Sequence, residues 1–203
     1  MPSSLVEVAN LALNRLGDQA ITTLTDDTDA ARTMNLIMTP TLDAKIRGHF
    51  WNWSQQRATL GQVEVGPLWS SSSENGFDYQ FQLPQDPFCL RVVATSLDAD
   101  QPYRIESYQT ATSSYRVLLC NQSAVSILYQ ARITDVTLWD GLFADAMAAE
   151  LAFQACYAIT RNGELKRVLY EEAKEAWRIA KSVDGQEQRT MKSITSYVLT
   201  RGR

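Results

Sequence analysis

The chain has 203 residues, of which 45% are hydrophobic and 21% are charged, and its formal net charge is −4 at pH 7. This length is sufficient for one folded domain, or for one core carrying a large insertion, and the composition is typical of folded soluble proteins. The negative charge argues against general nucleic-acid binding, which requires a strongly basic surface.

The apolar residues and the cysteines indicate where the protein is found. The sequence has no uninterrupted run of about 18 apolar residues, so we expect no membrane span. The start, MPSSLVEVAN, lacks the basic and apolar regions of a secretion signal. Cys89, Cys120 and Cys156 are odd in number and lie within apolar patterns, where free cysteine behaves as a small hydrophobic residue. A reducing cytoplasm is therefore favoured over a disulfide framework.

A first helix is predicted to begin at Leu5, because apolar residues then recur at steps of three and four along one face. Ser3 or Ser4 can cap it, and Glu7 follows Ser4 at the spacing of a capping box. Gly17 is placed to end the helix in a left-handed conformation.

An acidic cluster precedes the second helical pattern and consists of Asp26, Asp27, Thr28 and Asp29. A metal site is one interpretation, but the cluster lacks the loop glycine and the distal glutamate of an EF-hand loop. In the other interpretation, one of these residues caps the second helix and the others favour its positive end. The position as well as the residue types favours the cap.

The second helical pattern is predicted to end near Gly48 and contains Pro40. A proline there predicts either a kink or a restart with Thr39 as the new cap. His49 is the single histidine of the chain and lies beside the aromatic residues that continue to Trp53. A lone histidine among aromatic residues is more often a packed or surface residue than a ligand, since its chemistry normally needs an orienting partner.

Between residues 54 and 133 the apolar period changes from helical to alternating, which predicts an antiparallel β region. The short links between the expected strands favour meanders over crossovers. Residues 61–76 are rich in serine and glycine and predict an exposed loop, in which Trp69 is either a contact residue for a partner or packs back onto the sheet. Strands are expected at residues 55–60 (as an edge strand), 77–83, 88–95, 103–108, 114–119 and 124–133.

Helical periodicity returns after Thr137, which can cap a helix that begins at Leu138. Alanines recur through residues 144–158 and make this helix slim enough for close packing. A break at residues 162–163 separates it from a last amphipathic helix, so the two are predicted to form an antiparallel hairpin.

The C-terminal residues 186–203 are predicted to form a tail with a charge of +3, which leaves −7 for the rest of the chain. Met191, Ile194 and Val198 are spaced for one apolar helical stripe. A docking arm is one interpretation of this tail, and a disordered end is the other.

Motifs for catalysis and for cofactors are missing from the sequence. No GxGxxG follows a predicted strand, no GxxxxGK[ST] loop occurs, and no G-x-S-x-G surrounds a serine. One histidine without paired cysteines is not a usual zinc ligand set. Carboxylate pairs for glycoside cleavage stay compatible with the sequence, because the fold sets their geometry. We therefore expect no catalytic residues, no cofactor, no metal and no enzymatic activity.

Several segments resemble one bacteriophage family. In the first half they are LALNRLGDQAITTLTDDTDAARTMN and RGHFWNWSQQRATL, and the second half contains YQFQLPQDPFCLRVV and YQARITDVTLWDGLFADAMAAELAFQACYAITRN, with TSYVLTRGR at the end. Together these segments are similar to the tail tubular protein A family, the head-to-tail adaptors of short-tailed phages. The resemblance covers most of the chain, through motifs that are structural rather than catalytic.

The resemblance implies a structural virion protein of the viral tail, located at the head–tail junction and present in the host cytoplasm during assembly. Such adaptors form a dodecameric ring that binds the portal protein and presents a platform to the tail nozzle or tubular protein. DNA would pass through the ring during ejection without sequence-specific binding, and no membrane is involved. The tail would then dock on the portal, and Trp69 is the candidate contact with another tail protein. The candidate portal-binding residues are Met191, Ile194, Tyr197, Val198, Leu199 and Arg201.

The sequence thus predicts an α+β protein. Residues 1–53 and 134–185 are expected to form a helical bundle, residues 54–133 an inserted antiparallel β region, and residues 186–203 a docking tail. One rival function is a tail-associated hydrolase acting on the cell envelope or on a polysaccharide, which turnover assays would reveal. A small-molecule or nucleic-acid binding module is the other, and it would need a pocket or a basic groove.

Overall fold

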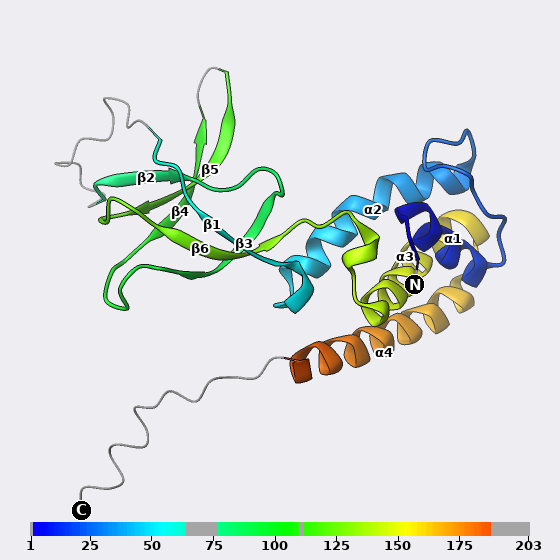
Figure 1. Ribbon diagram of the computed structural model, residues 1–203. Helices are drawn as coiled ribbons and strands as arrows, with labels where there is room; N and C mark the ends of the chain where they lie inside the picture. The colour runs from blue at the N-terminus through cyan, green and yellow to red at the C-terminus, as the bar shows by residue number, and fades with distance from the viewer. Residues whose placement is uncertain (1, 64–76, 110–111, 188–203) are drawn as a thin grey trace, which may run out of the picture.

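The computed structural model describes residues 2–63, 77–109 and 112–187, and over these ranges it contains four α-helices and six β-strands (Figure 1). The helices gather at one end of the molecule and the strands at the other. Two helices precede the strands in the chain and two follow them. The predicted α+β class is confirmed, with N-terminal helices, two small antiparallel sheets and a C-terminal helical hairpin.

Helix α1 spans Leu5–Leu16 and begins where the sequence predicts. Ser4 is the cap, since its Oγ accepts a hydrogen bond from the Glu7 backbone N–H at 3.2 Å. The Glu7 carboxylate reaches back to the backbone N–H of Ser3, at 2.6 Å, where a capping box would use that of Ser4. Gly17 ends the helix with φ of 72°, a conformation that favours glycine.

Helix α2 spans Asp29–Arg47, and the acidic cluster in front of it serves as its start. Thr28 is the cap, with its Oγ1 accepting from the Ala31 N–H at 3.1 Å, so the capping interpretation is confirmed. Pro40 lies inside one uninterrupted helix, so the predicted alternative of a restart at Thr39 is wrong. The proline deprives the Leu36 carbonyl of its partner, and Leu36 is 75% exposed, so water can satisfy that carbonyl.

Helix α3 spans Gly141–Thr160, and its start differs from the prediction. Asp140 is the cap and accepts from the N–H groups of Leu142 at 2.8 Å and Phe143 at 3.2 Å. Thr137 lies instead in a short 3-10 helix, η2, spanning Val136–Leu138. The helix cannot begin earlier because Trp139 is extended and buried, with its indole N–H donating to the Ile133 carbonyl at 2.9 Å.

Helix α4 spans Gly163–Glu187 and pairs with α3 as the predicted hairpin. Asn162 forms the break, because its side-chain oxygen accepts from the backbone N–H groups of the first turn of α4. The helix continues through Gly185, so the predicted start of the tail at residue 186 falls inside it. Contacts made by Asp184 with the rest of the protein, described below, hold this last turn in helical form.

The strands form two antiparallel sheets of three strands, in the orders β1-β6-β3 and β2-β5-β4. The prediction of meanders is wrong except for the β4–β5 hairpin, since the other pairs join strands that are not neighbours in the chain. The expected edge position of β1 is confirmed. Link length did not decide these pairings, because each strand pairs where its apolar face can be buried. The strands are β1 Gln55–Thr59, β2 Tyr79–Gln82, β3 Cys89–Thr95, β4 Arg104–Gln109, β5 Ser114–Cys120 and β6 Ser126–Ala131.

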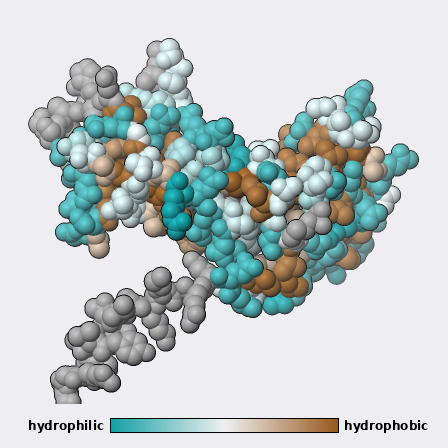
Figure 2. All heavy atoms as spheres, viewed as in Figure 1, coloured by the Kyte–Doolittle hydropathy of each residue, from teal (hydrophilic) through white to brown (hydrophobic). Residues whose placement is uncertain are grey.

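Helix α3 is the centre of the helical region and packs against the other three helices. Its alanines are buried except Ala158, as expected for close packing, and so is Cys156. Among the described helices, α3 alone has the length and apolar composition of a membrane span. Its apolar residues are used in the protein core, which accounts for that composition. On the surface, hydrophobic residues gather over the C-terminal part of α4 (Figure 2).

Candidate functional site at the junction of helices and sheets

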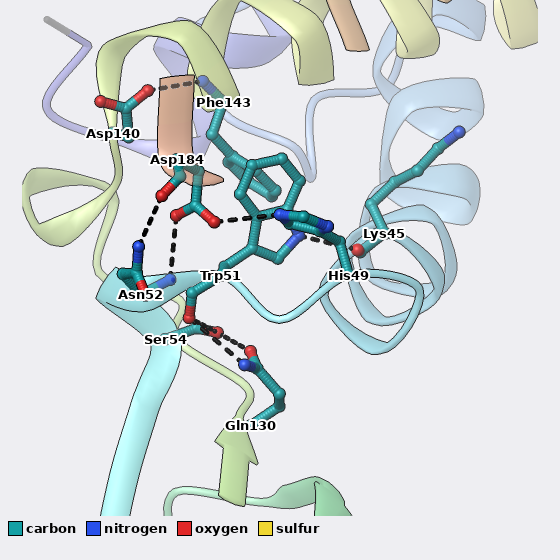
Figure 3. A network of polar contacts seen from close by, with 9 residues as sticks. All are labelled: Lys45, His49, Trp51, Asn52, Ser54, Gln130, Asp140, Phe143 and Asp184. Atoms are coloured by element: carbon teal, nitrogen blue, oxygen red, sulfur yellow. Dashed lines mark hydrogen bonds and ion pairs between the residues drawn. The ribbon is translucent and has the colours of Figure 1, made fainter. Parts of the chain in front are cut away.

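Most of the polar side chains that the fold buries lie where the helical region meets the sheets (Figure 3). The chain crosses this junction twice, between α2 and β1 and between β6 and α3. The first crossing contains the aromatic run that the sequence places at the entrance to the β region. Trp51 of this run is fully buried, and its indole N–H donates to the Lys45 carbonyl at 2.9 Å.

An aromatic cluster anchors both crossings to the helices. Phe143 of α3 is its centre and is fully buried. Ring centroids of four tryptophans lie 4.7 to 5.3 Å from that of Phe143, in the edge-on arrangement that aromatic pairs favour. They come from the first crossing, from the second crossing and from α4, so one side chain links three segments. These tryptophans are Trp51, Trp53, Trp139 and Trp177.

Asp184 ties the last turn of α4 to the first crossing. Its carboxylate accepts from the Asn52 backbone N–H at 2.9 Å and lies 3.0 Å from His49 Nε2 (Figure 3). The Asn52 side chain donates to the Asp184 carbonyl at 2.7 Å, which satisfies one of the free carbonyls at this helix end. Asp184 is only 6% exposed, so these contacts replace the water that the carboxylate loses.

A second polar group connects the first crossing to β6. Ser54 and Gln130 are both fully buried, and the Ser54 hydroxyl donates to the Gln130 side-chain oxygen. The Gln130 amide in turn donates to the Trp51 carbonyl at 3.3 Å. Because both side chains find partners, burial of a glutamine in the central strand of a sheet is tolerated here.

Arginines join the start of β3 to α2 and to β5, and the end of β6 to α2. Arg47 of α2 donates to the Leu90 carbonyl at 2.6 Å, and Arg116 of β5 donates to the Cys89 carbonyl at 2.9 Å. Arg132 pairs with Asp43 of α2, and this hydrogen bond raises the pKa of the guanidinium. Burial raises the pKa of the Cys89 thiol to about 11, although Arg116 and Arg47 act in the opposite direction.

Glu150 forms the corresponding polar centre within the helical region. Burial by itself would raise the pKa of its carboxyl group, but three partners outweigh that effect and lower it. They are Lys45, with Nζ 2.8 Å from a carboxylate oxygen, the Gln154 amide at 2.9 Å and the Trp177 indole at 3.0 Å. Each carboxylate oxygen therefore has a partner, as a charge that is only 13% exposed requires.

The polar side chains of this junction hold one another in place through hydrogen bonds and ring packing. His49 is oriented by Asp184 and packs edge-on against Trp51 with centroids 4.5 Å apart, so the single histidine is a packed residue with a partner. Ser54, the nearby hydroxyl in Figure 3, is engaged by Gln130. Within residues 2–63, 77–109 and 112–187, no group of three or more histidine, cysteine, aspartate or glutamate side chains is arranged to hold a metal ion.

The sequence nominates one loop residue and six tail residues for partner binding. Trp69 and the tail residues Met191, Ile194, Tyr197, Val198, Leu199 and Arg201 lie outside the described residues.

Sequence reasoning missed Asp184, Gln130 and Glu150 as residues that join elements. The available signal was a polar residue at a position where the apolar period requires a buried one, as for Asp184 four residues after Ala180. Comparison with known proteins assigns no role to these residues. No protein-family model matches the chain, and a search of the curated proteins finds no match.

Proposed function

We propose that this chain is a structural subunit of a ring-forming head-to-tail adaptor, joining the portal of a short-tailed phage to its tail nozzle or tube. One observation carries the proposal. The segments that resemble the adaptor family, LALNRLGDQ, RGHFWNW and ITDVTLWDGLFADAM, coincide with α1, the two crossings of the junction and α3. They supply helix caps, the aromatic cluster and the polar contacts. Residues that hold the fold together in this way are expected of a structural protein.

The division into two regions also supports this role. A ring subunit needs one region that meets its neighbours and another that meets the next protein in the assembly. The helical region offers exposed apolar residues on α2, α3 and α4, among them Leu36, Tyr157 and Val168 at 75%, 54% and 64% exposure. The sheets lie at the other end of the molecule, where they can present a platform (Figure 1). The polar contacts of the junction would hold the two regions at a defined angle.

Electron microscopy of the purified chain mixed with its portal protein tests this proposal. A ring seated on the portal, of the twelve subunits expected for the family, is the supporting result. Mass photometry of the same mixture measures the stoichiometry without averaging. Persistent failure to form a ring with the portal present contradicts the proposal.

Docking of the tail on the portal is a separate part of the proposal. A chain truncated after Glu187 keeps all of α4, and we expect it to fold normally and to lose portal binding. Circular dichroism serves as the control for the fold. Portal binding that survives the truncation rules out docking by residues 188–203 and leaves ring formation itself to be judged by microscopy.

A further inference from the structure

Three helices meet at a charged contact on one side of the helical region. Nη2 of Arg15 in α1 lies 2.5 Å from Oδ1 of Asp145 in α3, and its Nη1 lies 3.1 Å from Oε1 of Glu172 in α4. One guanidinium thus faces two carboxylates from two different helices. The side chains of Asp145 and Glu172 are 59% and 48% exposed, so both keep oxygens that further cations can reach.

Apolar residues follow the same helical stripes away from this contact. Leu11 precedes Arg15 by four residues, Leu142 precedes Asp145 by three, and Ile179 follows Glu172 by seven, so each lies on the stripe of its charged neighbour. These side chains are 43%, 37% and 39% exposed. We call this surface the Arg15 face, made up of Leu11, Arg15, Leu142, Asp145, Glu172 and Ile179. It combines exposed apolar side chains with a net negative charge.

The segment that follows α4 has the complementary composition. Residues 188–203 contain Arg189, Lys192, Arg201 and Arg203 and no acidic residue. Met191, Ile194 and Val198 add an apolar stripe at helical spacing. An amphipathic segment of this kind binds by laying its apolar side on an apolar surface, with its charges meeting opposite charges at the margin.

We propose that residues 188–203 dock on the Arg15 face of their own chain. The apolar stripe of the segment covers Leu142 and Ile179, and its basic residues pair with the free oxygens of Asp145 and Glu172. This contact belongs to the isolated subunit and does not depend on the portal. A partner that binds the same segment must first displace it from the helices.

The length of the segment and the place where it begins permit this docking. The segment starts directly after Glu187, at the end of the stripe that carries Ile179 and Glu172. The distance from Glu187 back to Glu172 along α4 is about 22 Å at the rise of an α-helix. The sixteen residues of the segment span up to about 50 Å when extended. Residues 188–203 can therefore turn back and reach the whole face without strain.

Disulfide trapping in the full-length chain tests the docking. The pair Ile179→Cys and Val198→Cys places one thiol on the Arg15 face and one on the segment. The matched control replaces Lys181 by Cys with the same Val198→Cys, because Lys181 is also exposed, lies close to Ile179 in the chain and points to the groove between α2 and α4. The native cysteines are buried and serve as a common background.

We expect the Ile179 pair to close its disulfide on the order of tenfold faster than the Lys181 pair, because docking raises the effective concentration of one thiol at the other. Added salt or the changes Arg201→Glu and Arg203→Glu should reduce this advantage, since they weaken the charge attraction. Equal rates for the two pairs overturn the proposal. The proposal is also overturned if the disulfide forms only between two copies of the chain. Mixing chains that carry one substitution each detects that outcome. Neither outcome bears on whether the chain forms a ring on the portal.

Discussion

The helical region and its junction with the sheets are held together by different forces. Among the helices, the alanines of α3 allow close packing of its neighbours, and Phe143 with the tryptophans around it forms an aromatic cluster that also anchors the two crossings. Outside this cluster, the contacts that join the helical region to the sheets are mostly hydrogen bonds and ion pairs, such as those of Asp184 and Arg132. Apolar packing is strong but tolerant of direction, whereas hydrogen bonds require one geometry. The helices thus supply stability, and the junction sets how the sheets are oriented.

The largest loss of stability is expected from a substitution in the aromatic cluster. Replacing Phe143 by Ala leaves a cavity between the surrounding tryptophans, and we expect the free energy of unfolding to fall by about 3–5 kcal/mol. Urea unfolding followed by tryptophan fluorescence measures the change. Tyr157→Ala is the matched control, because Tyr157 also lies on α3 but is 54% exposed, and it should change stability by less than about 0.5 kcal/mol. A similar change for both variants would mean that the cluster does not hold the helices.

A smaller effect is expected at the junction. Asp184→Ala leaves the Asn52 N–H and His49 without their acceptor, and we expect a loss of about 2–3 kcal/mol. Hydrogen exchange measured by mass spectrometry should show faster exchange in residues 49–54 and in the last turn of α4, with α1 unchanged. Asp184→Asn keeps one acceptor oxygen, so its stability and its exchange rates should lie between those of Asp184→Ala and those of the unaltered protein. Unchanged exchange at residues 49–54 would show that the sheets are oriented by other contacts.

The smallest effect concerns the polar centre of the helical region and depends on pH. Lys45, Gln154 and Trp177 hold the pKa of Glu150 below its ordinary value of 4.5 in the folded protein. The carboxylate therefore contributes stability above that value, and the contribution is lost as pH falls through the lower folded pKa. Glu150→Gln should cost about 1 kcal/mol at neutral pH and make stability less sensitive to acid below about pH 4.5. If both proteins lose stability equally as pH falls, protonation of Glu150 is not the cause of that loss.

The helix ends were largely predictable because they depend on residues within a few positions. Ser4, Thr28 and Asn162 act as local signals, and each lies within the few residues that the sequence indicates for a helix end. Asp140 was missed because Thr137 is an equally good cap in local terms. Burial of Trp139, a tertiary effect, decided between them. The strand positions were also predictable from alternation, whereas the pairing of the strands was not.

Sequence alone determined the class of the fold, the number and order of its main elements in the described ranges, and the burial of its cysteines, because these follow from apolar periodicity and composition. Tertiary structure decided which strands share a sheet and how the two regions meet. Asp184, Gln130 and Glu150 are polar residues whose partners lie far away in the chain. No local pattern specifies such partners, since their hydrogen bonds exist only after the helices and sheets have been brought together.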